Sequence, residues 1–414
     1  MVNELRERLK EWEEFEFPEM IEREIKVIPK EDIVAIVGPR RVGKTYLMYI
    51  TIKKLLKKVP RENVLYVSFD DIFYRKYNPK EILKEFESIF SPNKKYPIYI
   101  FFDEIQELNE WGRWLRSLHD SRKYKIVVSG SSSSLLLKEI STELRGRYHS
   151  ILLLPFSFRE YVKLKKQQNY EDMVEEYIKF GGFPEVIKLD NKVEKKQKLI
   201  ELFETIFYRD FVGRHRIREE VVARNLMEFL FSNVGNRFSI TKIHNTFRSL
   251  GINVSKRTLW KYTNKLEETL TLFLLRPFAL SKRKEMMLPR KVYSVDTGIS
   301  SIIQREMPMG RLMENVVFEE LLRKNDNAEL FYYIDTKNEV DFVIKRGIEI
   351  DKLIQVCYDI TDFSTKEREV NSLVNVSYKL KCKKLEVITK DYGGEEIVKK
   401  RKIKFVPLWK WLLS

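Results

Sequence analysis

A glycine-containing segment near the N-terminus carries the clearest chemistry in the chain. Residues 38–45 read Gly-Pro-Arg-Arg-Val-Gly-Lys-Thr, which matches the phosphate-binding P-loop pattern G-x-x-x-x-G-K-T. An apolar run precedes it at 33–37, and helical periodicity follows it from 45 to 57. A strand that turns into a helix N-terminus directs backbone N–H groups at an anion. We therefore expect nucleotide phosphates to contact Gly38, Pro39, Arg40, Arg41, Val42, Gly43, Lys44, Thr45 and Tyr46.

A second motif complements this loop about sixty residues further on. Residues 98–104 read Ile-Tyr-Ile-Phe-Phe-Asp-Glu, an apolar run that ends in two carboxylates. The ends of such strands form the ligand-binding edge of α/β sheets. We expect Asp103 and the Thr45 hydroxyl to hold Mg²⁺, Lys44 to reach the β- and γ-phosphates, and Glu104 to act as general base.

Two later segments supply further catalytic candidates. Ser131 follows the next predicted strand, where its hydroxyl is placed to sense a γ-phosphate. Arg145 and Arg147 lie in the sequence Leu-Arg-Gly-Arg and are candidates to stabilise negative charge in a transition state. Such arginines can act within their own chain or in a neighbouring copy. A surface role or a structural ion pair explains the same residues.

Strands and helices are predicted to alternate through the first 156 residues. We expect strands at 33–37, 64–69, 98–102, 126–129 and 151–154, with helices at 45–57, 79–90 and 111–119. This alternation is typical of a parallel sheet with helices on both faces. Residues 1–30 are predicted to form an amphipathic helix and a loop. Residues 157–208 are predicted to be helical, with a possible hinge where Phe-Gly-Gly-Phe-Pro interrupts them at 180–184.

Composition restricts the class of protein. The 414 residues are 43% hydrophobic and 33% charged, which indicates several globular domains. Two cysteines and four scattered histidines give neither a disulfide framework nor a metal cluster. No apolar run approaches the ~18 residues of a membrane span, and the charged N-terminus is unlike a signal peptide. We expect a cytoplasmic protein without a membrane partner.

Positive charge is concentrated in one segment. The net charge is +16, and residues 209–291 contain 18 Lys and Arg against 7 Asp and Glu. Two predicted helices, 239–250 and 255–270, flank a turn with helix-turn-helix spacing. We expect double-stranded DNA to contact an outer helix face and a wing tip, through Lys256, Arg257, Lys261, Lys282 and Arg283. A helical subdomain solvated by lysines is the alternative.

The last 123 residues contain a pattern similar to that of metal-dependent nucleases. A helix that opens at Glu314 is followed by strands at 338–344 and 353–357. The nuclease pattern has one acid, then Asp, then an acid-x-Lys strand, but here the third element reads Gln-Val-Cys at 355–357. An amide replaces a metal ligand and cysteine replaces the lysine that would activate water. We predict a nuclease-like fold without cleavage activity.

Taken in order, the motifs resemble those of a prokaryotic, mainly archaeal, family of AAA-type ATPases. They are the P-loop, Phe-Phe-Asp-Glu-Ile-Gln, Ser-Gly-Ser-Ser, Leu-Arg-Gly-Arg and Pro-Phe-Ser-Phe-Arg-Glu-Tyr at 155–161. The resemblance implies an α/β parallel-sheet P-loop NTPase domain at 1–156, a helical lid at 157–208, a winged helix-turn-helix at 209–291 and a restriction-endonuclease-like α/β domain at 292–414. It also implies Mg·ATP as ligand, Asp103 and Glu104 as the catalytic pair, and residues 180–184 as a lid motif.

The function predicted from these features is Mg-dependent hydrolysis of ATP to ADP and phosphate, coupled to conformational change on DNA. A nucleotide-dependent switch for a protein partner and an active DNA nuclease are the alternatives. A homo-oligomer with ATP at the boundary between subunits is a further expectation.

Overall fold

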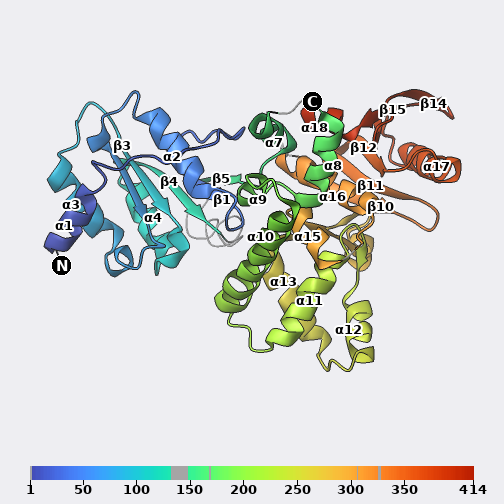
Figure 1. Ribbon diagram of the computed structural model, residues 1–414, viewed down its shortest axis with the longest axis horizontal. Coiled ribbons are helices and arrows are strands. Elements are labelled where there is room, and N and C mark those ends of the chain that lie inside the picture. Colours follow the sequence, from blue (N-terminus) through green and yellow to red (C-terminus); the bar gives the residue numbers. More distant parts are fainter. Residues whose placement is uncertain (1, 132–147, 167–168, 305, 325–327) are drawn as a thin grey trace. The chain divides into compact units, whose positions relative to one another are not determined.

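The computed structural model describes residues 2–131, 148–166, 169–304, 306–324 and 328–414. The chain forms two compact units, Met1–Leu153 and Leu154–Ser414, which are described separately (Figure 1). The expected lid, helix-turn-helix and C-terminal segments all fall in the second unit. The boundaries between those three segments stay predictions. No helix in the described ranges combines the length and apolar character needed to cross a bilayer.

The first unit is built on a five-stranded sheet of order β2-β3-β4-β1-β5, in which all four strand pairs are parallel. The predicted parallel sheet is therefore confirmed. Most of its residues are buried, as expected for a sheet covered on both faces. The strands are β1 (Ile33–Val37), β2 (Val64–Ser68), β3 (Ile98–Asp103), β4 (Tyr124–Gly130) and β5 (Tyr148–Leu152).

The helices of this unit begin where the sequence supplies caps. α3 begins after Asn78, whose side chain accepts a hydrogen bond from Glu81 N–H while Glu81 returns one to the Asn78 backbone. α2 and α4 contact β4 of the sheet, and α1 packs on α3 (Figure 1). The helices are α1 (Val2–Lys10), α2 (Lys44–Leu55), α3 (Pro79–Phe90) and α4 (Trp111–Asp120), with short 3-10 turns η1 (Arg61–Asn63), η2 (Tyr74–Lys76) and η3 (Ile105–Glu107).

An aromatic cluster attaches the N-terminal segment to the sheet. The ring centroids of Trp12 and Tyr66 lie 5.9 Å apart, and those of Tyr49 and Tyr66 lie 5.0 Å apart. Trp12 Nε1 also donates a hydrogen bond of 2.7 Å to Val64 O. Phe15 stacks on Trp12 and contacts Tyr49 at 5.2 Å. Burial of these rings holds residues 12–17 against α2 and β2.

The second unit begins with a run of helices, as predicted for residues 157–208. The run continues through a π-helical segment, η4, and a further helix. The elements are α7 (Phe158–Lys165), α8 (Tyr170–Phe180), α9 (Pro184–Ile187), α10 (Lys192–Thr205), η4 (Ile206–Gly213) and α11 (Glu220–Ser232). Ser157 and Glu160 form a reciprocal capping box at the start of α7.

The glycine pair between α8 and α9 meets α15 (Thr297–Ile303) at close range. Gly182 N–H donates a hydrogen bond of 2.6 Å to Asp296 Oδ2. Gly181 has a φ of +73°, and a Cβ there would lie 1.9 Å from Asp296 Oδ1. A Cβ at Gly182 would lie 2.3 Å from Phe156 O, so close approaches by two different neighbours explain why both positions are glycine. The hinge role expected for them stays a prediction.

The two helices predicted at 239–250 and 255–270 are present as α12 (Ile240–Ser249) and α13 (Lys256–Glu268), while the helix-turn-helix assignment stays a prediction. Ser255 caps α13, because its Oγ accepts a hydrogen bond of 3.0 Å from Thr258 N–H. Ser239, the first residue of the predicted helix and a residue type that often caps helices, stands at the N-cap of α12 but makes no side-chain capping bond with the described residues. Leu259, Thr263, Leu266 and Leu270 are buried, which leaves the opposite face of α13 outward.

A three-stranded sheet of order β6-β9-β7 accompanies these helices. Its strands are β6 (Arg237–Phe238), β7 (Leu272–Leu275) and β9 (Arg290–Ser294). The connection between β7 and β9 contains β8 (Pro277–Phe278) and α14 (Lys282–Met287). Lys282 and Arg283 therefore lie in the first turn of a helix, and β8 pairs with β10 of the next sheet.

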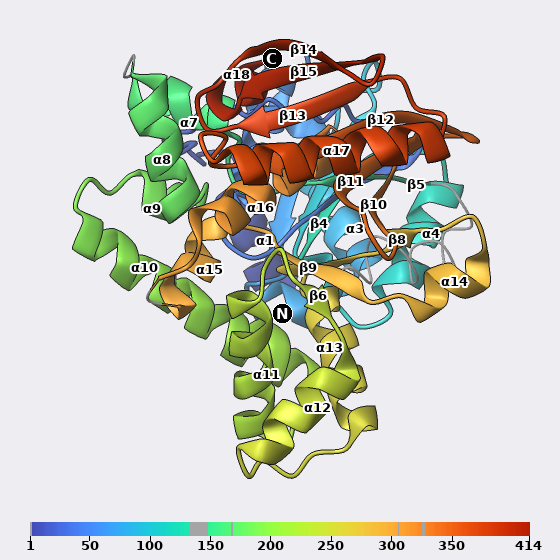
Figure 2. The ribbon, with the colours of Figure 1, turned by 90° about the vertical axis from the view of Figure 1, so that its right-hand side faces the viewer.

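The C-terminal part contains a seven-stranded mixed sheet of order β14-β15-β13-β12-β11-β10-β8. α17 lies along one face (Figure 2), while α16 contacts β12 and α18 contacts β13 and β15. α16 begins at Met309, five residues before the predicted start at Glu314. The elements are α16 (Met309–Arg323), β10 (Glu329–Ile334), β11 (Glu339–Arg346), β12 (Glu349–Cys357), α17 (Phe363–Lys379), β13 (Leu385–Thr389), β14 (Gly394–Val398), β15 (Arg401–Pro407) and α18 (Leu408–Leu413).

Candidate nucleotide-binding site

The P-loop connects the end of β1 to the first turn of α2. Gly43 adopts a φ of +93°, which favours glycine, and α2 begins at the next residue. Gly38 lies so close to the neighbouring backbone that a Cβ there would be 2.1 Å from Leu153 O. Both glycines of the motif are therefore required by the shape of the loop. α2 begins at Lys44, directly after the loop, so the N–H groups of its first turn lie beside the loop, as an anion site requires.

Lys44 lies across this loop and is buried. Its Nζ donates hydrogen bonds to Gly38 O at 3.1 Å and to Pro39 O at 3.0 Å. The same atom is 3.3 Å from Glu104 Oε1. The ammonium thus stands between the phosphate-binding loop and the predicted general base.

Asp103 ends β3 and receives hydrogen bonds from three hydroxyl groups. Thr45 Oγ1 donates to Asp103 Oδ2 at 2.6 Å, Tyr66 Oη donates to the same oxygen at 3.0 Å, and Ser129 Oγ donates to Oδ1. Burial and the neighbouring charge of Glu104 raise the pKa of Asp103 above its usual value. A cation close to this carboxylate would favour its charged form.

Glu104 follows with an unusual backbone conformation, a φ of +50°. Its N–H donates a hydrogen bond of 3.0 Å to Ser129 Oγ, and its Oε2 accepts one from Gln106 Nε2. Burial raises the pKa of Glu104, but the positive charge of Lys44 and the Gln106 hydrogen bond outweigh it, so that the net shift is downward. The carboxylate is therefore ionised at neutral pH, as a proton acceptor must be.

Four residues of this site were missed by the sequence prediction: Arg23, Tyr66, Gln106 and Ser129. Gln106 Nε2 lies 3.4 Å from Ser131 Oγ, so its amide connects the predicted base to the predicted γ-phosphate sensor. Gln106 Oε1 is buried and has no hydrogen-bond partner among the described residues. Arg23 Nη1 donates to Val42 O at 2.9 Å, which brings the N-terminal segment to the P-loop. Gln106 and Ser129 lie inside quoted motifs, whereas nothing in the sequence indicated Arg23 or Tyr66.

The remaining predicted residues are placed less closely. The Tyr46 ring is 44% exposed and lies 6.2 Å from the ring of Tyr49, at the start of α2. Arg40 lies near enough for its charge to lower the pKa of Glu104. Arg145 and Arg147 lie outside the described residues, so their predicted roles stay predictions.

The oxygen groups at this edge fit a small, hard cation. Mg²⁺ prefers oxygen ligands and is usually held by one or two side chains together with phosphate oxygens and water. Thr45 Oγ1 and Asp103 Oδ2 form such a pair. Within the described ranges there is no group of three or more His, Cys, Asp or Glu arranged to hold a metal without a ligand. A nucleotide would have to complete the coordination shell.

The basic face of α13 is a second candidate site. Lys256, Arg257 and Lys261 are exposed, and none of them makes a hydrogen bond or an ion pair with the described residues. Trp260 lies among them and is 43% exposed, with the Arg290 guanidinium 5.7 Å from its ring centroid. Lys282 on α14 is different, because its Nζ pairs with Glu285 Oε2 at 3.0 Å. Three of the five predicted DNA contacts thus share one helix face.

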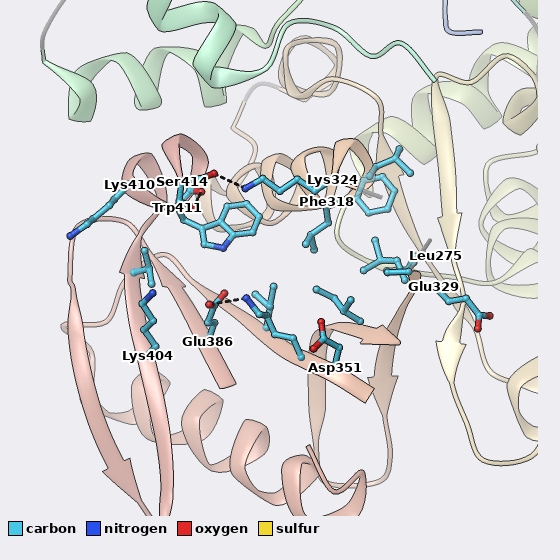
Figure 3. Close-up of a pocket in the computed structure, with 18 of the residues that line it drawn as sticks. Leu275, Phe318, Lys324, Glu329, Asp351, Glu386, Lys404, Lys410, Trp411 and Ser414 are labelled. Atoms are coloured by element: carbon cyan, nitrogen blue, oxygen red, sulfur yellow. Dashed lines mark hydrogen bonds and ion pairs between the residues drawn. The ribbon is translucent and has the colours of Figure 1, made fainter. Parts of the chain in front are cut away.

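A cavity of about 970 Å³ lies in the second unit (Figure 3). Apolar side chains from several elements line it, among them Leu275, Phe318 and Trp411. Lys352 Nζ pairs with Glu386 Oε1 at 2.9 Å within it. The cavity offers apolar contact area, but the charges of Lys352 and Glu386 neutralise each other rather than facing a ligand. The P-loop edge is therefore the stronger candidate for chemistry.

Comparisons with known proteins agree with the geometry of the P-loop edge. Residues 30–162 match the family described as AAA domain. Residues 171–307 and 309–411 match two domains of unknown function, DUF8612 and DUF4143. None of these matches assigns a restriction-endonuclease fold to the C-terminal part, so that expectation stays a prediction.

Relatives cover almost the whole chain. An uncharacterized protein of Methanocaldococcus jannaschii is 36% identical over 416 residues, which are 94% of this chain and 90% of that protein. An uncharacterized protein of Haemophilus influenzae is 29% identical over 372 residues, covering 88% of this chain and 91% of the relative.

Solved structures show a weaker likeness. The ORC1 protein of Aeropyrum pernix in complex with DNA is 12% identical with a TM-score of 0.25, covering 74% of this chain and 91% of that one. AMPPCP-bound DnaA from Aquifex aeolicus is 14% identical with a TM-score of 0.29, covering 64% and 86%. These scores are too low to carry an argument about this chain. With its P-loop edge and its full-length archaeal relative, the chain belongs to a family of AAA-domain proteins that includes the Methanocaldococcus protein.

Proposed function

We propose that this protein is a Mg-dependent ATPase that hydrolyses ATP to ADP and phosphate. One observation carries the proposal: the 2.6 Å contact of Thr45 with Asp103 lies beside the 3.3 Å pair of Lys44 with Glu104. The first pair supplies oxygen ligands for a cation, and the second supplies a positive charge and an ionised base. Phosphoryl transfer requires these groups at one place.

Each residue then has a distinct role. Backbone N–H groups of the P-loop and the Lys44 ammonium bind the phosphates. Thr45 and Asp103 hold Mg²⁺, which when bound supplies positive charge to the phosphate oxygens. Glu104 orients the attacking water and accepts its proton, while Gln106 holds the Glu104 carboxylate in position. Ser131 is the sensor of the γ-phosphate.

Replacement of the base tests the proposal most directly. Glu104→Gln keeps the shape of the side chain but removes its basicity, so it should bind ATP while hydrolysis falls by about 10²–10⁴-fold. Glu107→Gln is the matched control, because Glu107 lies three residues away and pairs with Arg75 at 3.2 Å. Steady-state phosphate release and equilibrium binding of ATP are measured for both. Parental hydrolysis in Glu104→Gln would show that the assigned base is wrong.

We further propose that the protein binds double-stranded DNA through the face of α13. The three cations Lys256, Arg257 and Lys261 support this, since each is exposed and unpaired within the described ranges. The strands β7 and β9 beside α12 and α13 are compatible with a winged helix-turn-helix whose connection carries Lys282 and Arg283. Neutralisation of phosphates by these side chains would release counterions and make binding sensitive to salt.

A double substitution tests the DNA proposal. Arg257→Ala/Lys261→Ala should weaken binding to duplexes of any sequence and reduce the slope of log affinity against log salt by about 1.8, since each phosphate contact contributes about 0.9. Lys57→Ala/Lys58→Ala removes the same charge from two exposed lysines of the first unit and is the control. Equal affinities for the parent and the α13 variant would rule out this face.

Stimulation of the ATPase by DNA separates coupled action from the alternative role. An ATPase that acts on DNA should hydrolyse faster when duplex is present, and the α13 double variant should lose the increase. A nucleotide-dependent switch for a protein partner should hydrolyse slowly whether or not DNA is present. The helical segment at 157–208 would act as the lid in either case.

We also retain the proposal that Arg147 completes the ATP site of a neighbouring copy. Arg147→Ala and Lys44→Ala chains should each be inactive, yet a mixture should recover activity because each chain supplies what the other lacks. A mixture as inactive as its components, together with a monomeric mass in ATP, would exclude a shared site. Arg145 is open to the same test.

A further inference from the structure

A buried lysine lies at the centre of three carboxylates in the second unit. Lys291 is 2% exposed, and its Nζ lies 2.8 Å from Glu339 Oε1, 2.9 Å from Asp341 Oδ1 and 3.1 Å from Glu314 Oε1. Burial lowers the pKa of Lys291, but Asp341 and Glu314 raise it well above its usual value overall. The side chain therefore carries its proton in the folded protein.

The three acids come from elements that are distant in sequence. Lys291 belongs to β9 of the three-stranded sheet, Glu314 to α16, and Glu339 and Asp341 to β11 of the seven-stranded sheet. All four residues line a cavity of about 660 Å³. The ammonium, which comes from the three-stranded sheet, thus occupies the point where α16 and the seven-stranded sheet present their acids to a common space.

The surrounding hydrogen bonds fix the carboxylates in place. Asp341 Oδ2 accepts from Val356 N–H at 2.9 Å, which directs its other oxygen to Lys291. Tyr293 Oη donates to Glu314 Oε1 at 2.5 Å. Gln355, where the nuclease pattern has its third acid, is engaged elsewhere: its Oε1 accepts from Asp341 N–H at 3.3 Å and its Nε2 donates to Glu369 Oε2 at 2.6 Å.

This geometry is close to that of a divalent-cation site. Ca²⁺ binds carboxylate oxygens at about 2.3–2.6 Å, a few tenths of an ångström shorter than the distances around the Lys291 nitrogen. Mg²⁺ needs shorter bonds of about 2.0–2.1 Å in near-octahedral geometry. Burial and the charge of Asp341 raise the pKa of Glu314 to about 7, so this acid readily exchanges a proton, and the cluster of three acids around one ammonium would be balanced better by a divalent ion.

We propose that Lys291 is a built-in cation that takes the position of a divalent metal ion among Glu314, Glu339 and Asp341. The wild-type cluster is therefore closed to metal, and the C-terminal part does not cleave DNA through it. Shortening residue 291 opens a carboxylate site that takes Ca²⁺ in preference to Mg²⁺, and Mn²⁺, which also binds carboxylates, serves as its spectroscopic probe. This inference is independent of the ATPase, because the cluster lies entirely in the second unit.

The test compares metal binding by full-length chains without nucleotide. Lys291→Ala should bind one Mn²⁺ per chain more than wild type in electron paramagnetic resonance titrations, and Ca²⁺ should raise its melting temperature. Lys291→Ala/Asp341→Asn should lose both effects. Lys291→Met is the matched control, since it removes the charge but still fills the space, so neither ion should bind or stabilise it.

Folding of the variants supplies a second readout. Three uncompensated carboxylates are expected to prevent Lys291→Ala from folding in a chelator. Refolding yield that rises with Ca²⁺ in Lys291→Ala, but not in Lys291→Met, would support the inference. Lys291→Ala that folds equally well with and without Ca²⁺ and binds no additional Mn²⁺ would overturn it. Wild-type Mn²⁺ binding that disappears in Asp341→Asn would overturn it as well.

Discussion

Thr45 Oγ1 and Asp103 Oδ2 lie 2.6 Å apart although 58 residues separate them in sequence. The sheet order explains this contact. β1 leads into the P-loop, β3 ends at Asp103, and β4 lies between them with all three strands parallel. The two motifs that the sequence indicates separately therefore meet at one edge of one sheet.

This contact predicts that Thr45 contributes to the increase in ATP affinity caused by Mg²⁺. Thr45→Val removes one oxygen ligand without changing the shape of the side chain, so the increase in ATP affinity caused by Mg²⁺ should fall at least about 10-fold. Thr51→Val is the control in the same helix, because Thr51 Oγ1 bonds only to Leu47 O at 2.8 Å among its described partners. Calorimetric titration of ATP with and without Mg²⁺ measures the difference. An unchanged Mg²⁺ effect in Thr45→Val would remove Thr45 from the metal site.

Gln106 is predicted to position the general base. Its hydrogen bond lowers the pKa of Glu104, so Gln106→Leu should lower kcat with little change in KM and move the acidic limb of the kcat–pH profile to higher pH. Gln197→Leu, an exposed position on α10, is the control. A purely structural role would lower the melting temperature without moving the pH profile.

Protonation of His215 is predicted to lower the free energy of unfolding in acid. Burial, together with the nearby charges of Lys265 and Arg214, lowers the pKa of His215 to about 4, although Glu268 Oε2 lies 3.7 Å from its Nδ1. The unfolded chain has a histidine pKa of about 6.5 and binds the proton first. The stabilisation is therefore complete above pH 6.5 and is lost as pH falls toward 4. Denaturant titrations should show a weaker pH dependence in that window for His215→Gln than for wild type. Identical slopes would contradict the assignment.

Two glycines have nearly equal φ angles but differ in their surroundings, and Gly181 also has a ψ of −165°, a backbone conformation that is essentially restricted to glycine. Gly181 has φ +73° and no room for a Cβ beside Asp296. Gly251 has φ +77°, and a Cβ added there would have no described atom within 4 Å apart from its own chain neighbours. Gly251→Ala should cost about 1–2 kcal/mol in free energy of unfolding, from backbone strain alone. Gly181→Ala should cost clearly more, and Asp296→Ala in the same chain should recover part of the difference. Equal losses for both glycine variants would mean that the surroundings of Gly181 adapt without cost.

Local patterns predicted the first unit well because its signals are short-range. The apolar runs of β1 to β4 and the P-loop glycines are visible in the sequence, and each strand begins and ends within a few residues of its prediction. Tyr66 was missed because its contact with Asp103 depends on the order of the strands. Lys291 was missed because its three acids lie 23, 48 and 50 residues away, so only tertiary structure reveals its burial.

The C-terminal part was predicted least completely, also for physical reasons. Two of the buried positions of α17 are serines, Ser372 and Ser377, and its first two turns contain mostly polar and charged residues, which weakens its helical pattern. β14 is a mostly exposed edge strand with two adjacent glutamates, so it carries little apolar signal. The sheet that these elements form depends on long-range pairing rather than on local propensity.

The pairing of β8 with β10 has a consequence for dissecting the protein into fragments. β8 lies in the connection between β7 and β9, yet it forms the edge of the seven-stranded sheet. Cleavage between residues 291 and 292 would remove that edge strand from the downstream piece and separate Lys291 from its acids. The downstream piece would lose the edge strand of its sheet, and the upstream piece would lose the acids that neutralise Lys291. A genetic truncation at this sequence boundary should yield insoluble or unfolded products, whereas a break at 153 leaves the second unit intact.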